Sequence, residues 1–302
     1  MIKSLKANLL LQEGPIPADM GNLTARYIQR SMEKVISKDG TVIAFDRWGK
    51  GPALILVGGS FEQRAMDSET SQLAAQPILS EHFSVFHYDR RGRGDSTDTQ
   101  PYAVVREVED IEALIDEAGG SAFVSGISSG AILAMEAAIQ LGDKVKKLAL
   151  YEPPYNFRED ATGDELKKFR KRFKEALAEG RRGDAVGYFL EMLGLPPEEL
   201  EGIRQLPMWP MWEAIAPTFG YDAALMGEDG SVPTQDAARI AVPTLIMNGS
   251  ASFPSIHSTA VSLAAAIPHA QHRTLEGQPH EVAAEVLAPV LVAFFHSPEP
   301  FK

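Results

Sequence analysis

Residues 122–141, AFVSGISSGAILAMEAAIQL, join a short apolar run, a glycine-rich turn and an apolar helical pattern. The turn, Gly126-Ile-Ser128-Ser-Gly130, has the pattern G-x-S-x-G. At such a turn the small residues let strand and helix approach closely, and the strained backbone exposes the central hydroxyl at the start of the helix. The stretch therefore predicts that Ser128 is a nucleophile; Ser129, at the variable position, is the weaker candidate.

The alternation of short apolar runs with helical patterns continues along the chain and predicts an α/β fold, with a mostly parallel sheet covered by helices on both faces. Eight runs are expected to be strands, the first two forming a hairpin around Asp39-Gly40: 33–37, 42–48, 53–57, 84–87, 122–125, 147–151, 243–247 and 272–275. Four further segments, which lie between these strands or after the last one, have helical spacing: 104–118, 129–141, 256–266 and 281–295.

The alternation of strand and helix patterns is interrupted between residues 153 and 240. This segment contains charged helix-formers, a Pro-Pro pair and the Met- and Trp-rich run MWPMWEAIAPTF. The strand PTLIMNG then resumes the earlier pattern. We therefore expect a helical cap, 153–240, inserted into a core formed by 1–152 and 241–302.

Charge and composition exclude several classes of function. A net charge of -12 would repel nucleic acid and anionic membranes, so we expect a small-molecule partner and neither of these. The absence of cysteine excludes a thiolate nucleophile and zinc–thiolate sites. The N-terminal residues contain no signal-peptide pattern and no run is long enough to span a membrane, so a cytoplasmic location is expected. The oligomeric state stays open, a homo-oligomer included.

A second glycine pair ends the buried run Ile55–Val57 and reads Gly58-Gly59-Ser60. It should lie at the sheet edge where the Ser128 turn emerges. An acyl-transfer intermediate carries an oxyanion that needs two preorganised N–H donors. We assign them to the backbone amides of Ser60 and Ser129, the alternative being a plain glycine turn.

Four motifs in order make the chain resemble the α/β-hydrolase superfamily from about Thr41 to Phe295: VGGS at 57–60, YDRRGRGDS at 88–96, GISSG at 126–130 and LEGQPH at 275–280. The resemblance implies the α/β-hydrolase fold with a cap and a serine mechanism that uses no metal and no organic cofactor. The family usually has His-Gly where this chain has Gly58-Gly59, but backbone amides still supply the donors. We interpret the DRRGRGDS segment as architectural, with no catalytic role.

His280 follows a short strand and precedes a helix, where this family places its general base. We therefore predict that His280 is the base. The other histidines lack this context and are interpreted as surface or packing residues: His82, His87, His257, His269, His272 and His296.

The acid of a triad is missing from its usual place. The strand PTLIMNG continues as Gly249-Ser-Ala-Ser252, and a serine cannot orient an imidazole as a carboxylate does. Glu152 ends the preceding strand, at the position from which haloalkane dehalogenases and zearalenone lactonases take their acid. We expect Glu152 to be the acid; the rival Glu276 is too close to His280 in sequence to face its ring easily.

An apolar pocket is expected beneath the cap, lined by Phe61, Met208, Trp209 and Trp212. The helical spacing of the cap residues is also what packing on a core would produce. We predict a carboxylic ester hydrolase or lactonase that acts through an acyl-enzyme. A carbon–carbon bond hydrolase or a cofactor-free perhydrolase would use a similar triad, and without an orienting acid the chain would be a binding protein on a hydrolase fold.

Overall fold

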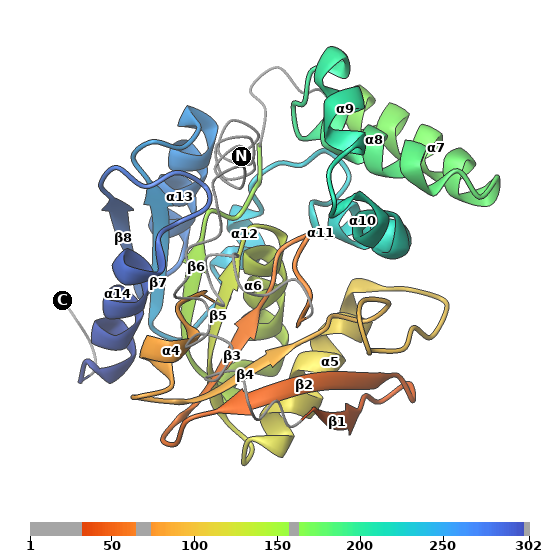
Figure 1. The fold of residues 1–302 in the computed structure, drawn as a ribbon. Coiled ribbons are helices and arrows are strands. Elements are labelled where there is room, and N and C mark those ends of the chain that lie inside the picture. Colours follow the sequence, from red (N-terminus) through yellow and green to blue (C-terminus); the bar gives the residue numbers. More distant parts are fainter. Residues whose placement is uncertain (1–31, 65–73, 157–162, 299–302) are drawn as a thin grey trace, which may run out of the picture.

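The computed structural model describes residues 32–64, 74–156 and 163–298 of the 302-residue chain. The N-terminal segment 1–31, in which we expect no leader sequence, lies outside the described residues. All eight predicted strands are present: β1 (Glu33–Ile36), β2 (Val42–Trp48), β3 (Ala53–Val57), β4 (Ser84–Tyr88), β5 (Ala122–Ile127), β6 (Val145–Tyr151), β7 (Thr244–Gly249) and β8 (Ala270–Leu275). Figure 1 shows them in one continuous sheet.

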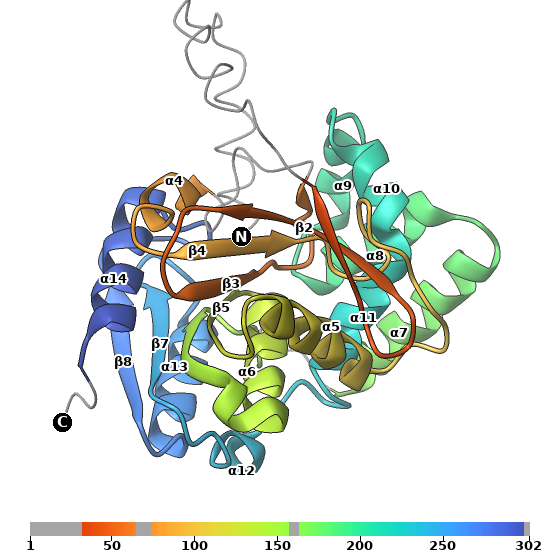
Figure 2. The same cartoon turned by 90° about the horizontal axis from the view of Figure 1, so that it is seen from below.

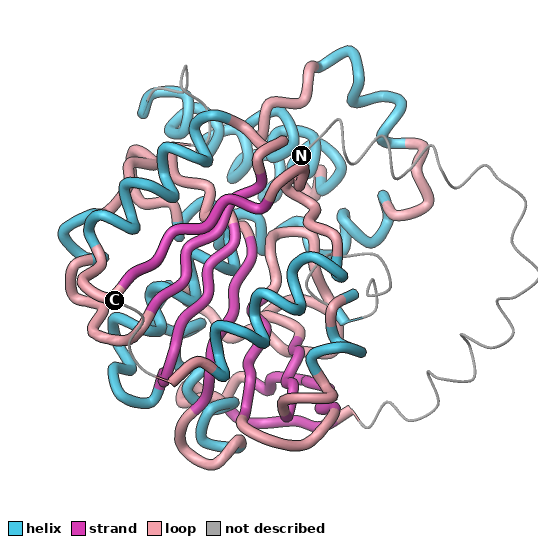
Figure 3. The backbone as a smooth tube through the Cα atoms, turned by 90° about the vertical axis from the view of Figure 1, so that its left-hand side faces the viewer, coloured by secondary structure: helices cyan, strands magenta, loops and turns pink. Residues whose placement is uncertain are grey.

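The sheet has the strand order β1-β2-β4-β3-β5-β6-β7-β8 and confirms the predicted mostly parallel arrangement. β2 is antiparallel to β1 and β4, whereas the pairs from β4 through β8 are parallel. The predicted β1–β2 hairpin turns at Gly40, whose φ of 86° favours glycine. In Figure 3 the strands run side by side between helices. Their parallel carboxyl ends therefore meet at one edge.

Helices cover both faces of the sheet, as Figure 2 shows. One face carries four helices: α5 (Val104–Glu117), α6 (Ser129–Leu141), α12 (Thr234–Ala237) and α13 (Pro254–Ala266). The opposite side carries α4 (Gln76–Leu79) and α14 (Ala284–His296). Each face has its own cluster of buried apolar side chains, because a sheet enclosed on both sides buries alternate residues in two separate cores.

The segment between β6 and β7 is helical, as expected of a cap. Its helices are α7 (Gly163–Ala178), α8 (Arg182–Met192), α9 (Pro197–Arg204), α10 (Trp209–Ile215) and α11 (Phe219–Leu225). α7 to α10 lie at the upper right of Figure 1, and α11 contacts both α7 of this group and the sheet-flanking α5 and α6. A third apolar cluster, rich in aromatic residues, is built almost entirely from these helices.

The start of the last helix was predicted wrongly. We expected it at residue 281, but α14 begins at Ala284. The side-chain oxygen of Gln278 accepts a hydrogen bond from the backbone N–H of Ala283 at 2.9 Å, which satisfies one amide before the helix starts. His280 therefore lies on an extended loop, four residues ahead of the helix. Among the described residues, no helix has the length and apolarity needed to cross a membrane.

Candidate active site

Ser128 occupies the sharp turn between β5 and α6. Its φ of 55° and ψ of -130° are strained for a residue with a side chain. Two glycines permit the turn: a Cβ on Gly126 would lie 2.3 Å from the Gly130 carbonyl oxygen, and one on Gly130 would lie 2.2 Å from that of Val57. The sequence G-x-S-x-G thus forms the strand-turn-helix structure expected of it, and Ser128 stays partly exposed while Ser129 is buried.

Glu152 stands beside this turn because of the register between β5 and β6. Ile127 and Tyr151 are paired in the two strands, so Ser128 and Glu152 are the next residues on each. The amide of Ser128 donates to the carbonyl oxygen of Tyr151 at 2.9 Å. Glu152 also has a left-handed φ, 51°, and its side chain is fully buried. Both residues therefore leave the sheet through strained turns at the same edge.

The Glu152 carboxylate is bound by three donors. Oε1 accepts from the backbone N–H of Gly249 at 2.8 Å, and Oε2 accepts from the hydroxyl of Ser252 at 2.8 Å. Nδ1 of His280 lies 2.6 Å from Oε2, a distance typical of a short hydrogen bond to a carboxylate. Ser252 stands where the family's acid was expected, and here it supports the replacement acid instead.

The loop that carries His280 is fixed to the ends of two strands. Tyr151 donates its hydroxyl to the carbonyl oxygen of Pro279 at 2.5 Å. The Gln278 carbonyl oxygen accepts from the amide of Ala251 at 3.0 Å. The rival acid, Glu276, is exposed at the surface. The structure therefore brings His280 to Glu152 and not to Glu276.

The other histidines lie elsewhere. His87 is buried in β4, and Nε2 of His272 is 2.7 Å from Oδ1 of Asn248. The remainder are exposed: His82, His257, His269 and His296. Across the described residues, no group of three or more His, Cys, Asp and Glu side chains could hold a metal ion.

The loop Gly58–Ser60 faces the turn at Ser128. A Cβ on Gly59 would lie 3.2 Å from the Cβ of Ser128, a tight contact that a glycine avoids. The hydroxyls of Ser60 and Ser129 are 3.1 Å apart. Neither backbone amide of these two serines forms a hydrogen bond with any described residue. The two serines assigned to an oxyanion hole are thus neighbours, and their amides have no partner in the described part of the chain.

The side chains of Glu62 and Arg93 hold this loop, although neither was predicted to take part in the site. Glu62 Oε2 accepts from the backbone N–H of Gly59 at 2.9 Å, and Nη1 of Arg93 donates to the Gly59 carbonyl oxygen at 2.5 Å. Both peptide groups at Gly59 are therefore fixed. The spacing Gly59-x-x-Glu62, which favours a local side-chain-to-backbone bond, is the one signal that could have identified Glu62.

Arg90 and Arg93 connect the core to the cap. Arg90 Nη1 lies 2.7 Å from Asp222 Oδ1 in α11, and Arg93 Nη2 lies 2.9 Å from Oδ2. Arg90 also pairs with Glu107 at 2.7 Å, and all four side chains are buried. Burial alone would raise the pKa of Asp222, but the charges of the two arginines bring it below its ordinary value. The DRRGRGDS segment therefore has the architectural role predicted for it.

All four predicted pocket residues lie in the aromatic cluster of the cap or pack against it. Phe61 reaches up from the core and contacts Trp212, with ring centroids 4.8 Å apart, and Phe219, at 5.0 Å. Trp209 is buried and donates its indole N–H to Glu213 at 2.9 Å. Met208 is partly buried against the same cluster. Their role in binding a substrate stays a prediction.

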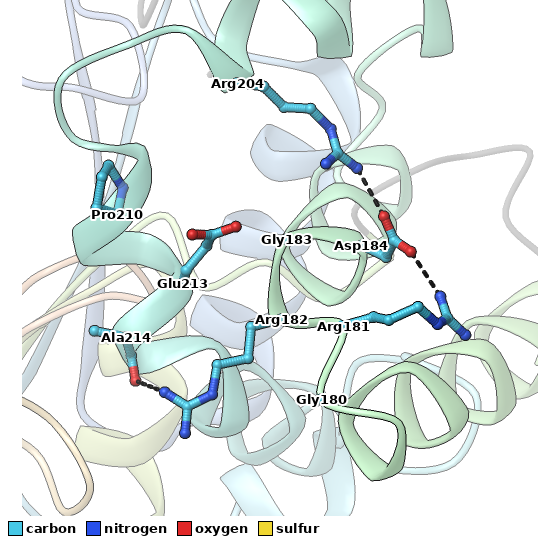
Figure 4. A pocket seen from close by; sticks show the side chains of 9 residues that line it. All are labelled: Gly180, Arg181, Arg182, Gly183, Asp184, Arg204, Pro210, Glu213 and Ala214. Carbon is cyan, nitrogen blue, oxygen red and sulfur yellow. Dashed lines mark hydrogen bonds and ion pairs between the residues drawn. The ribbon is translucent and has the colours of Figure 1, made fainter.

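A separate hollow of about 600 Å³ lies on the cap (Figure 4). All of its lining residues fall between Gly180 and Ala214, so none comes from the core. Figure 4 shows Asp184 between Arg181 and Arg204, with ion pairs of 2.6 and 2.9 Å. Since these charges pair with one another away from Ser128, the hollow is not part of the candidate active site.

Comparison with known proteins identifies the family of the chain. Residues 53–285 match the alpha/beta hydrolase family. The solved structure of an alpha/beta hydrolase from Sphaerobacter thermophilus is 49% identical, with a TM-score of 0.78 over 87% of this chain and 100% of that one. A hydrolase from Pseudomonas aeruginosa is 25% identical, with a TM-score of 0.65 over 88% and 99%. An enol-lactonase from Burkholderia xenovorans shares the fold at 22% identity, with a TM-score of 0.60 over 88% and 100%. The chain belongs to the alpha/beta hydrolase family.

Proposed function

We propose that the protein is a serine hydrolase that cleaves a carboxylic ester or lactone through an acyl-enzyme. The observation that carries the proposal is the 2.6 Å contact between Nδ1 of His280 and the buried Glu152 carboxylate, at the strand end next to the strained Ser128. A carboxylate at Nδ1 keeps the proton on that nitrogen, which leaves Nε2 free to act as a base. Ser128, His280 and Glu152 are the proposed triad.

The proposed reaction begins when Ser128 Oγ attacks the ester carbonyl carbon and Nε2 of His280 takes the hydroxyl proton. This step requires Oγ and Nε2 to come within hydrogen-bond reach in the substrate complex. The amides of Ser60 and Ser129 then bind the oxyanion. His280 returns the proton to the leaving oxygen as the carbon–oxygen bond breaks, and a water molecule activated by His280 hydrolyses the acyl-enzyme.

The buried position of Glu152 supports its proposed part in this cycle. Imidazolium forms in each transition state, and a carboxylate at hydrogen-bond distance stabilises it more strongly in a site that excludes water. The bonds from Gly249 and Ser252 hold the carboxylate in place, so little reorganisation is needed when the charge appears. The aromatic surface around Phe61 and Trp212 favours an apolar substrate of small to medium size.

The proposal is tested with a short p-nitrophenyl ester and a fluorophosphonate probe. We expect turnover of the ester and a single phosphonylated residue, Ser128, identified by peptide mass spectrometry. Ser128→Ala should remove both, whereas Ser262→Ala, which changes an exposed hydroxyl on α13, should keep both. Circular dichroism establishes that each variant is folded. A folded wild type that is not labelled, or a Ser128→Ala variant that retains turnover, would overturn the proposal.

A further inference from the structure

Glu62 places a carboxylate close to the proposed nucleophile. Its Oε2 accepts the Gly59 amide at 2.9 Å, and a Cβ on Gly59 would lie 3.8 Å from the hydroxyl oxygen of Ser128. With standard backbone bond lengths, these contacts put the Glu62 carboxylate within about 9 Å of the Ser128 hydroxyl. A Cβ on Gly58 would lie 2.8 Å from Oε2, so the side chain folds back over this loop.

The Glu62 side chain is enclosed but still reachable. It keeps part of its solvent-accessible surface. Burial nonetheless raises its pKa, although the hydrogen bond from Gly59 and the charges of Arg93 and His280 act in the opposite direction. Its second oxygen, Oε1, forms no hydrogen bond with the residues that the structure describes. Glu62 is thus a partly exposed carboxyl group with one oxygen that has no partner among the described residues.

The other charged side chains around the site are paired with one another. Arg90 and Arg93 are matched by Glu107 and Asp222 in buried ion pairs. His280 is held by Glu152. No ion pair with Glu62 is formed within residues 32–64, 74–156 and 163–298. Glu62 is therefore a carboxyl group near Ser128 that has no ion-pair partner among the described residues.

We propose that Glu62 determines specificity: the site accepts esters or lactones that are neutral or carry an ammonium group near the reacting carbonyl, and rejects those that carry a carboxylate there. A substrate carboxylate would be desolvated next to a second, unpaired carboxylate, which is unfavourable in a medium of low dielectric constant. An ammonium group would supply the missing countercharge and could donate a hydrogen bond to Oε1. This inference rests on the proposed function, because it names the substrate class of the same site.

Three p-nitrophenyl esters with acyl chains of similar length test it: the butyrate, the 4-carboxybutyrate and the 4-(trimethylammonio)butyrate. At pH 8 the wild type should have its lowest kcat/KM for the carboxylate ester. In Glu62→Gln the ratio of kcat/KM for the carboxylate ester to that for the butyrate should rise about tenfold, since two charges about 9 Å apart interact with at least this strength at an effective dielectric constant of 20. The corresponding ratio for the ammonium ester should fall by a similar factor.

Glu276→Gln is the matched control, because it removes the same charge from an exposed position on the His280 loop and should leave both ratios unchanged. Calorimetric binding of benzyltrimethylammonium and 3-phenylpropionate to Ser128→Ala, with and without Glu62→Gln, measures the same preference without turnover. A preference for the cation that Glu62→Gln abolishes supports the inference even if no ester is cleaved. Ester cleavage with ratios that respond equally to the two substitutions would overturn the inference and leave the proposed hydrolase intact.

Discussion

Arg93 donates a hydrogen bond through Nη1 to the carbonyl oxygen of Gly59 at 2.5 Å, and this contact sets the direction of the next amide. In a planar trans peptide the C=O and N–H point in opposite directions. The peptide between Gly59 and Ser60 therefore turns its N–H away from Arg93 when its carbonyl faces the guanidinium. Arg93 is in this way a positioning residue for one of the two proposed oxyanion donors.

Arg93→Lys should lower kcat by about 10- to 100-fold with little change in KM, because an oxyanion donor acts in the transition state and not on the bound ester. A trifluoromethyl ketone, which forms an oxyanion with the serine, should lose affinity by a similar factor. Thr218→Val is the control, since it removes the contact of Arg93 Nε with the cap and leaves the Gly59 contact in place. A matching loss in both variants would indicate that Arg93 acts only through the cap.

Glu152→Gln should reduce kcat/KM for ester hydrolysis by about 10³-fold or more, because the amide supports neither the imidazole tautomer nor the imidazolium. The effect of Ser252→Ala should be several-fold at most, since the Gly249 amide and His280 still hold the carboxylate. Glu276→Gln, at an exposed site, should match the wild type. Steady-state kinetics of the three variants show which carboxylate is the acid of the triad. A large loss of activity in Glu276→Gln would contradict the assignment of Glu152.

Asp222 should make the stability of the protein depend on acid pH. Its pKa in the folded state is lowered, so the unfolded chain takes up the proton first as the pH falls. The stabilisation is complete above the ordinary carboxyl pKa of 3.8 and is lost as the pH falls below it. Asp222→Asn should cost about 3–5 kcal/mol at pH 7, because it leaves Arg90 and Arg93 without a buried counterion.

Urea denaturation of the wild type and Asp222→Asn at several pH values between 7 and 3 measures this linkage. The difference in their free energies of unfolding should be constant from pH 7 to about pH 5 and then shrink towards pH 3. Asp236→Asn, which changes an exposed member of a surface ion pair, should show no such difference. A gap that widens on acidification would contradict the sign of the pKa shift.

Gly126→Ala should destabilise the fold by about 3 kcal/mol, because the new methyl group overlaps the Gly130 carbonyl and the start of α6. Gly202→Ala is the control: its Cβ would meet nothing within 4 Å, and alanine favours a helix. Urea denaturation should therefore rank Gly202→Ala at or above the wild type and Gly126→Ala well below it. Equal stability of Gly126→Ala and the wild type would show that the turn can relax.

The sequence predicted the parts of the site that depend on local patterns. Apolar runs located all eight strands, and small residues in a fixed spacing located the turn at Ser128. The partners of the arginines could not be found in this way, because Arg93 and Asp222 are 129 residues apart and meet only through the packing of the cap. Glu62 could not be found for a related reason: it differs from the buried carboxyl groups of the site in having no ion-pair partner among the described residues, and no local pattern reveals this.

The adjacency of Ser128 and Glu152 across the β5–β6 ladder has a consequence for engineering. The proposed nucleophile, the proposed acid and one proposed oxyanion donor all belong to the continuous β–α–β segment 122–152, which ends just before the cap begins. A different cap can therefore be inserted after Glu152 without changing the sequence that separates these groups. A chimaera must also keep the loops that carry Ser60 and His280 in place, and its new cap must supply a buried carboxylate for Arg90 and Arg93.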